Sequence, residues 1–212
     1  MNDAATKPLR IIIFAKAPQA GLAKTRLIPA LGAQGAAALA RVMLLHTVSA
    51  ALKADVGTVE LCATPATDDI AWRDIPLPEG IVISAQGEGD LGARMARATK
   101  RASEDGERIL LIGTDCVEMS ACLLQQAAQM LDDHNAVIHC TADGGYALLG
   151  LRRFDSLLFT DMPWSTDAVA GMTLDRLERL GWHTHVAQVL HDVDEPQDLQ
   201  RLPPHWIEHV AA

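Results

Sequence analysis

The chain contains 212 residues, of which 49% are hydrophobic and 21% are charged. This composition excludes a disordered chain, and it predicts one domain over residues 1–212 with a core from about 9 to 202. Lys and Arg number 18 against 27 Asp and Glu, so the formal net charge is −9. A chain this acidic, with only 4% aromatic residues, is not expected to bind nucleic acid.

The apolar runs in the sequence are short, and none is expected to span a bilayer. Residues 1–8 are polar and lack the apolar core of a secretory signal. The four cysteines form no C-x-x-C pair, and their spacing matches no zinc module. We therefore expect reduced thiols in a cytoplasmic protein. The sequence leaves the oligomeric state open.

In chain order, the first two thirds alternate short apolar runs with helical patterns. The predicted strands are 10–14, 58–63, 81–84 and 108–113. The predicted helices are 33–54, 91–103 and 120–132, and 68–80 is predicted to be an irregular connection. Strand 10–14 is expected to be buried on both faces, because its apolar run does not alternate with polar residues. Ser120 is the expected N-cap of the third helix.

The last third has a different rhythm. Strands are predicted at 136–140, 146–151 and 184–189, a helix at 165–180 capped by Ser165 or Thr166, and a short helix at 196–202. The whole pattern predicts an α/β fold with three layers, α/β/α, and a mostly parallel sheet that contains one antiparallel strand. Such sheets bind ligands beyond the carboxyl ends of their strands, here after Phe14, Ser84, Gly113 and Val189.

A basic loop follows the first predicted strand. It carries Lys16, Lys24 and Arg26 around Gly21. Cations gathered at a strand end attract an anion such as a polyphosphate, and a glycine lets the backbone approach it closely. The loop superficially resembles a P-loop but lacks two of its glycines. The alternative interpretation is a solvated basic loop without a ligand.

Carboxylates follow two other predicted strands. Asp115 comes directly after strand 108–113, and Asp192 and Asp194 come after the last strand. Oxygen ligands at this rim suit Mg²⁺ or Mn²⁺, which commonly uses one or two carboxylates plus substrate phosphates. The structural alternatives are that Asp115 caps or turns the chain before the next helix and that Asp194 caps the short helix after the last strand.

Two glycine-containing segments also carry alternatives. Asp143, followed by Gly144 and Gly145, could act as a base or position an acceptor hydroxyl, although Asp-Gly-Gly is also a plain turn signal. The run Gly87 to Gly92 fits G-x-G-x-x-G, the pattern of a dinucleotide-binding oxidoreductase. Its two acidic residues would place negative charge beside a pyrophosphate, which disfavours that interpretation.

Taken together, the segments resemble a known family. They occur in a fixed order: Phe14-Ala15-Lys16-Ala17-Pro18, Gly21, Lys24-Thr25-Arg26-Leu27, Gly89-Asp90-Leu91-Gly92-Ala93-Arg94-Met95, Ile112-Gly113-Thr114-Asp115-Cys116, Asp143-Gly144-Gly145-Tyr146, Trp164-Ser165-Thr166 and Asp192-Val193-Asp194-Glu195-Pro196. From about residue 10 to 202 the chain resembles the DUF2064 family, whose members are assigned as GT-A glycosyltransferases. It is more distantly similar to the molybdopterin-cofactor and phospholactate nucleotidyltransferases.

The resemblance implies a nucleotide-diphospho-sugar transferase (GT-A) fold and a set of site residues. It implies that the nucleotide contacts Ala15, Lys16, Ala17, Gly21, Lys24, Arg26, Gly92 and Thr114. It implies a divalent metal, Mg²⁺ or Mn²⁺, on Asp115 with Asp194 as partner and Asp192 nearby. It places the acceptor near Asp143, Gly144, Gly145 and Trp164, and it gives Asp115, Asp143 and Lys24 the catalytic roles.

The function expected from these residues is metal-dependent transfer from a nucleotide-activated donor to a small-molecule acceptor. The leading expectation is a glycosyltransferase that uses an NDP-sugar. The alternative is a nucleotidyltransferase that moves an NMP unit from an NTP to a phosphorylated or cofactor-like acceptor. An NAD(P)-dependent oxidoreductase and a binding protein without turnover are weaker alternatives.

Overall fold

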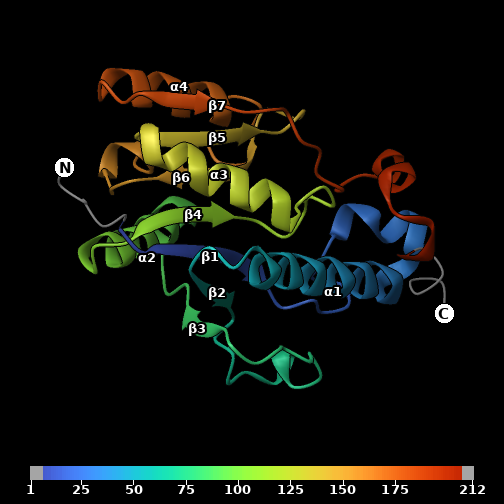
Figure 1. The fold of residues 1–212 in the computed structure, drawn as a ribbon. Helices are drawn as coiled ribbons and strands as arrows, with labels where there is room; N and C mark the ends of the chain where they lie inside the picture. Colours follow the sequence, from blue (N-terminus) through green and yellow to red (C-terminus); the bar gives the residue numbers. More distant parts are fainter. Residues whose placement is uncertain (1–6, 207–212) are drawn as a thin grey trace.

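A computed structural model describes residues 7–206 of the chain. Its centre is a seven-stranded sheet in the order β3-β2-β1-β4-β6-β5-β7 (Figure 1). The strands are β1 (Leu9–Lys16), β2 (Thr58–Thr64), β3 (Val82–Ala85), β4 (Arg108–Ile112), β5 (Ala136–Cys140), β6 (Tyr146–Leu151) and β7 (Thr184–Val186). The α-helices are α1 (Ile28–Ala54), α2 (Leu91–Glu104), α3 (Ala121–Asp133) and α4 (Val169–Arg179).

The predicted fold class is confirmed. β6 is antiparallel to both of its neighbours, β4 and β5, whereas the other adjacent strands pair in parallel. The parallel strands therefore end at one edge of the sheet, on the right of Figure 1. The connections that leave this edge are the ones in which we expected ligand-binding residues.

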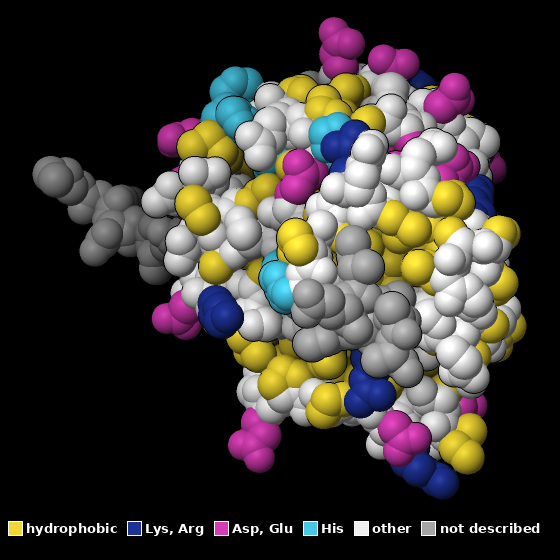
Figure 2. All heavy atoms as spheres, turned by 90° about the vertical axis from the view of Figure 1, so that its right-hand side faces the viewer, with side chains coloured by type: hydrophobic (Ala, Val, Ile, Leu, Met, Phe, Trp, Pro, Cys, Tyr) yellow, Lys and Arg dark blue, Asp and Glu magenta, His cyan; other side chains and the backbone are white. Residues whose placement is uncertain are grey.

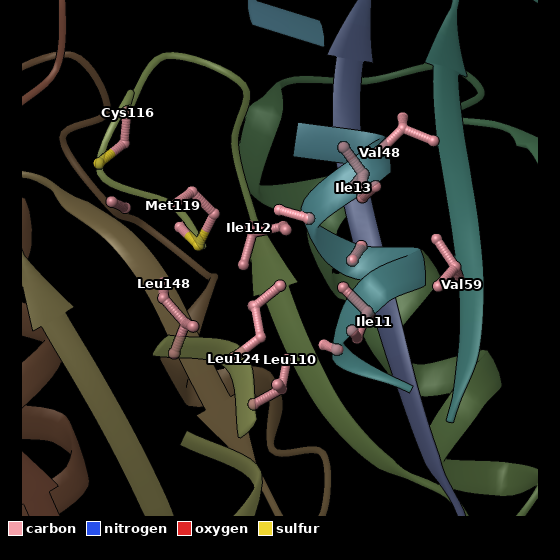
Figure 3. Packing of buried hydrophobic residues seen from close by; sticks show 14 of the residues in the cluster. Ile11, Ile13, Val48, Val59, Leu110, Ile112, Cys116, Met119, Leu124 and Leu148 are labelled. Atoms are coloured by element: carbon pink, nitrogen blue, oxygen red, sulfur yellow. The ribbon is translucent and has the colours of Figure 1, made fainter. Parts of the chain in front are cut away.

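Alternating side chains of β1 divide the core between the two faces of the sheet. Ile11 and Ile13 pack with α1 and α3 on one face, where Val48 and Leu124 are among their neighbours (Figure 3). Ile12 points to the other face and joins a cluster that includes Met95 of α2 and residues of α4. Because successive strand residues point to opposite faces, an uninterrupted apolar run such as β1 fills both layers of core.

Helix α1 is longer than the predicted helix 33–54. A 3₁₀ turn, Thr25–Leu27, leads straight into it, and the helix begins at Ile28. Gly32 interrupts it with φ +70°, so the regular helix expected from residue 33 lies beyond this kink. By length and composition Thr25–Ala54 could cross a membrane, although no apolar run of the sequence was expected to span a bilayer. More than half of its most apolar window is buried inside the protein, where it covers the sheet.

Two predicted elements of the last third are shorter in the structure. Helix α4 begins at Val169 rather than 165, because Ser165 has φ +65° and cannot be the first turn of a right-handed helix. Strand β7 ends at Val186 because the chain then leaves β5, and Leu190 instead forms an isolated parallel bridge with Thr141. The last predicted helix is a 3₁₀ helix, Pro196–Arg201.

The predicted connection 68–80 is irregular apart from a 3₁₀ turn, Ile70–Trp72.

A buried charge network ties the strands together near their amino ends. Glu60 of β2 is 1% exposed and accepts hydrogen bonds from Arg10 of β1, Ser84 of β3 and Arg101 of α2. The Arg10 guanidinium also pairs with Glu107, just before β4. Because each of these groups has a charged or polar partner, the network can stay inside the protein without an unpaired charge.

Candidate active site

A cavity of about 630 Å³ lies at the carboxyl ends of the parallel strands. Its lining comes from seven parts of the chain: Phe14, Lys24, Thr25, Arg26, Leu91, Met95, Leu111, Ile112, Gly113, Asp115, Asp143, Gly145, Tyr146, Ala147, Trp164, Ser165, Thr166, Asp167, Val169, Asp192 and Asp194. Figure 2 looks onto this end of the molecule, where charged, histidine and apolar side chains are interspersed. A concave site lined by apolar and converging charged groups is typical of a small-molecule pocket.

Lys24 joins the two carboxylates predicted to bind metal. Its ammonium donates to Asp115 Oδ1, to Asp194 Oδ1 at 3.1 Å and to the carbonyl of Val193 at 2.7 Å. The Lys24 side chain is 5% exposed, whereas Asp115 and Asp194 are 47% and 42% exposed. The ion pairs therefore lie at the cavity wall. The lysine side chain is buried in the protein, and both carboxylates are open to the cavity.

Backbone pairing brings the two carboxylates together from positions far apart in the sequence. Cys116 and Asp192 form an antiparallel bridge, and the Val193 amide donates to the Asp115 carbonyl at 2.9 Å. The segment after β7 thus lies against the segment after β4. Asp115 and Asp194 flank this short ladder, which brings their backbones together.

Neither Asp115 nor Asp194 caps the helix that follows it. Ser120 caps α3, since its hydroxyl accepts from the Leu123 amide, so Asp115 is not the cap. The 3₁₀ helix after β7 is capped by a capping box of Glu195 and Asp198. Asp194 is therefore free to face the cavity and Lys24.

The carboxylates create a surplus of negative charge at the cavity. Burial, followed by the charges of Asp115, Asp194 and Asp143, raises the pKa of Asp192 to about 7. Burial and the charge of Asp115 also raise the pKa of Asp194. For Lys24, burial alone would lower the pKa, but the two carboxylates outweigh it and the pKa is raised. The shifts show that the carboxylates repel one another and that each is stabilised by a neighbouring cation.

The Asp-Gly-Gly segment forms a tight turn and also contributes to the cavity. Asp143 Oδ1 accepts from the Thr141 hydroxyl and from the Gly145 amide at 3.1 Å. Gly144 has φ +91°, and its carbonyl accepts from the Ala170 amide at 2.8 Å, which docks the start of α4 on the turn. The segment can therefore be both a turn and part of the site, because the turn holds Asp143 at the cavity wall.

A second, smaller cavity of about 290 Å³ lies next to the first. Asp143, Asp192, Asp194 and Arg26 line both cavities. The carboxylate cluster thus stands between two spaces that two substrates could occupy. This arrangement is suited to transfer of a group between a donor and an acceptor.

Trp164 lines the main cavity, and Gly92 fixes its position from behind. A Cβ on Gly92 would lie 2.7 Å from Trp164 Nε1 and 2.4 Å from the Phe159 carbonyl. Gly92 does not line the cavity. It permits close packing of helix α2 against the loop that carries Trp164, which differs from the direct nucleotide contact that the resemblance implied.

The basic loop is only partly directed at the cavity. Lys24 and Arg26 line it, but the Lys16 ammonium turns back to the carbonyl of Leu22 at 3.0 Å. Ala15 and Ala17 are buried, and neither they nor Gly21 and Thr114 line the described cavities. The loop folds on itself because the amides of residues 22 and 23 both bond to the Gln19 carbonyl, so it forms no open nest of amides.

The glycine-rich run before α2 does not present a free helix end. The Asp90 side chain accepts from the Ala93 amide, so a carboxylate already occupies the position where a pyrophosphate would bind. The Arg97 guanidinium bonds to the carbonyls of Gln86 and Glu88, which closes the turn. This geometry opposes a dinucleotide-binding role.

Several residues at the cavity were not predicted. Phe14, Leu91 and Met95 give one wall an apolar character, and the hydroxyl of Tyr146 is buried there without a hydrogen-bond partner in the described residues. Burial raises the pKa of Tyr146. The strand-end rule could have identified Phe14, but the positions of Leu91 and Met95 depend on how α2 packs.

Asp115 and Asp194 offer oxygen ligands to a divalent ion. Within residues 7–206, no group of three or more His, Cys, Asp or Glu side chains is arranged to hold a metal ion. Asp115 and Asp194 nevertheless form a hard-oxygen pair, already bridged by a cation, at the wall of an open cavity. Two carboxylates completed by substrate phosphates fit Mg²⁺, and a third protein ligand is not required.

Comparison with known proteins identifies the family. The family model described as "Uncharacterized protein conserved in bacteria (DUF2064)" matches residues 47–166, more than half of the chain. The chain belongs to the DUF2064 family. A search of the curated proteins found no match.

Solved structures share the fold of this DUF2064 protein. A protein of Desulfovibrio desulfuricans G20, assigned as a nucleotide-diphospho-sugar transferase, is 29% identical with a TM-score of 0.81, covering 88% of this chain and 82% of its own. A 4-diphosphocytidyl-2C-methyl-D-erythritol synthase is 11% identical with a TM-score of 0.61, covering 93% and 97%. A manganese complex of Rv0371C from Mycobacterium tuberculosis H37Rv is 16% identical with a TM-score of 0.50, covering 92% and 97%. The fold is that of nucleotide-diphospho-sugar transferases and nucleotidyltransferases, which supports a transferase enzyme.

Proposed function

We propose that this DUF2064 protein transfers a group from a nucleotide-activated donor to a small-molecule acceptor, with the help of a divalent cation. The observation that carries the proposal is the meeting of Lys24, Asp115 and Asp194 at the wall of the 630 Å³ cavity. These residues come from three segments at the carboxyl ends of the sheet. A cation between carboxylates, beside a space large enough for a nucleotide, suits the chemistry of a polyphosphate.

In this proposal the donor phosphates lie against Lys24 and Arg26, the two basic residues that line the cavity. Asp115 and Asp194 would hold the divalent cation, and Asp192 would contribute charge from behind them. A bound Mg²⁺ or Mn²⁺ would neutralise charge that develops on the leaving phosphate oxygens. The apolar wall of Phe14, Leu91 and Met95 is suited to the base or the sugar ring of the donor.

The acceptor would enter on the side of Asp143, Gly145 and Trp164. The Asp143 carboxylate is fixed through Oδ1 by Thr141 and Gly145, and it borders both cavities. A carboxylate held in this way can accept the proton of an attacking hydroxyl. Its rigid turn would keep the acceptor oriented toward the donor.

Glycosyl transfer from an NDP-sugar is the leading form of the proposal, supported by the 29% identical structure assigned to that class. Nucleotidyl transfer from an NTP is the second form. It is favoured by the single aspartate after β4, where many glycosyltransferases have Asp-x-Asp, and by the fold shared with the 4-diphosphocytidyl-2C-methyl-D-erythritol synthase. Both forms use the same cationic loop and carboxylates.

Product analysis separates the two forms. The purified protein is incubated with a panel of NDP-sugars or NTPs and acceptors, with Mg²⁺ or Mn²⁺, and the nucleotide products are resolved by ion-exchange chromatography. Release of a nucleoside diphosphate with a glycosylated acceptor supports glycosyl transfer, whereas release of pyrophosphate supports nucleotidyl transfer. If an Asp115→Asn variant forms the same product at the same rate, the proposed site is wrong.

A further inference from the structure

We infer that the ammonium of Lys24 is an internal substitute for the divalent cation, so that the metal binds only when Lys24 leaves the two carboxylates. This inference rests on the proposed function, because it assigns the metal to Asp115 and Asp194. Its consequence is that donor and metal depend on each other: each binds weakly alone and more tightly when the other is present.

The contacts of Lys24 are those of a bound cation. The ammonium contacts one oxygen of each carboxylate and the carbonyl of Val193, which makes three oxygen partners from two segments. Its side chain is 5% exposed, although both carboxylates are more than two-fifths exposed. A metal on Asp115 and Asp194 would need the same two carboxylates that Lys24 contacts, and it would stand within a few ångströms of a buried positive charge. The two cations therefore exclude each other.

The backbone of Lys24 and the position of Arg26 favour movement of the Lys24 side chain away from the carboxylates. Its backbone lies in the left-handed region, with φ +45° and ψ +49°, where residues other than glycine, asparagine and aspartate are rarely found. It stands just before the 3₁₀ turn that carries Thr25 and Arg26 to the same cavity. Donor phosphates bound at Arg26 would offer the ammonium new anionic partners. Contacts between the ammonium and the phosphates would then replace its contacts with Asp115 and Asp194, and the metal would bind between the two carboxylates.

This exchange predicts positive coupling between donor and metal. A donor that draws Lys24 away raises the affinity for the metal, and by thermodynamic linkage the metal raises the affinity for the donor by the same factor. The substitute cation also has a role before binding, because it holds Asp115 and Asp194 at a separation that a divalent ion can use. Without any cation their mutual repulsion would drive them apart.

The first test measures Mn²⁺ binding to the protein alone by electron paramagnetic resonance, in which the signal of free Mn²⁺ falls as the ion is bound. The Lys24→Met variant keeps an unbranched side chain only one atom shorter, and the left-handed backbone, but removes the charge. We expect it to bind Mn²⁺ about tenfold or more tightly than wild type, because a competing cation is removed. Lys24→Arg keeps the charge and should stay close to wild type.

Lys100→Met is the matched control. Lys100 pairs with Glu104 at 2.9 Å on the exposed face of α2, so its loss changes the net charge by the same amount away from the cavity. It should leave the Mn²⁺ affinity within about twofold of wild type, as expected for a distant, screened charge. Equal Mn²⁺ affinities of Lys24→Met and wild type would overturn the inference.

The second test uses the wild-type chain and does not depend on a variant that folds. An amine-reactive acetylating reagent is applied briefly, and the modification of each lysine is measured by mass spectrometry. Lys24 should be protected without metal, and its labelling should rise severalfold at an Mn²⁺ concentration that the resonance signal shows to be saturating. Lys100 should be labelled equally in both samples. Protection of Lys24 that persists when Mn²⁺ is bound would contradict the inference.

The same data separate a failure of this inference from a failure of the proposed function. If wild type and Lys24→Met bind Mn²⁺ equally and Asp115→Asn abolishes the binding, the metal site stands and only the substitution by Lys24 is wrong. If no variant binds Mn²⁺ and nucleotides do not restore binding, the metal site in the proposed function is wrong as well.

Discussion

The turn that holds Asp143 allows a sharp test of the site's architecture through Gly144. This glycine has φ +91°, and a Cβ there would lie 2.2 Å from the Asp167 carbonyl oxygen and 2.4 Å from the Asp167 Cα. Both atoms belong to backbone and cannot rotate away. A Gly144→Ala variant must therefore push the segment before α4 off the turn, or change the turn itself.

The cost can be worked out from two contributions. A side chain in the left-handed region costs about 1–2 kcal/mol, and forcing an extra carbon into a packed site costs about 1–3 kcal/mol. Gly144→Ala should thus lower the free energy of unfolding by about 2–5 kcal/mol, a large part of the usual 5–15 kcal/mol of a domain. The assay is urea denaturation followed by circular dichroism.

Gly171→Ala is the control, because it lies on α4 close to the same turn. An added Cβ at Gly171 meets no atom within 4 Å, and the residue is exposed within the helix. This change should raise the free energy of unfolding by about 0.5–1 kcal/mol, since alanine is the better helix former. If Gly144→Ala were as stable as wild type while Gly171→Ala behaved as expected, the described packing of the turn against α4 would be refuted.

Three further predictions concern the site and the buried charges. Asp115→Ala should weaken metal-dependent nucleotide binding by about a hundredfold or more in isothermal titration, because a bound cation contributes several kcal/mol; an unchanged affinity would remove Asp115 from the site. Trp164→Ala should lower ligand affinity by about tenfold with little change in metal affinity, since the indole lines the cavity and makes no hydrogen bond to Asp115 or Asp194 in the described residues, and equal ligand affinity would place the ligand elsewhere. Glu60→Ala should lower the free energy of unfolding by about 3–5 kcal/mol in urea denaturation, because Arg10 and Arg101 lose a buried partner, yet folded protein should bind nucleotide as wild type does. A stable Glu60→Ala variant would show that this network contributes little.

The sheet could be predicted because its strands are locally distinct. β1 and β4 are uninterrupted apolar runs, and β5 and β6 flank a Gly-Gly turn, so their boundaries are visible without tertiary information. The start of α4 could not be predicted in this way. Its position depends on Ser165 taking a left-handed backbone and on the Gly144 carbonyl bonding to Ala170, which are long-range features.

Part of the candidate site could also be predicted from the sequence. The strand-end rule places Asp115 and the segment after β7 at one edge of the sheet, and the structure shows them joined by a short ladder. The contact of Lys24 with both carboxylates could not be foreseen, because it depends on a left-handed residue in a loop. The fold of this loop also places Lys16 and Gly21 away from the cavity, although the sequence predicted them as ligand-binding residues just as it did Lys24.

The most direct test of the central claim is a thermal-shift measurement with NTPs, NDP-sugars and NAD(P), each with EDTA, Mg²⁺ or Mn²⁺, on wild type and Asp115→Asn. A ligand that binds only the folded state raises the melting temperature, by an amount that grows with its concentration relative to Kd. We predict a rise with NDP-sugars or NTPs that requires the metal and is lost in Asp115→Asn. A rise with NAD(P) alone, or one that neither EDTA nor Asp115→Asn affects, would contradict a nucleotide and metal site built on Lys24, Asp115 and Asp194.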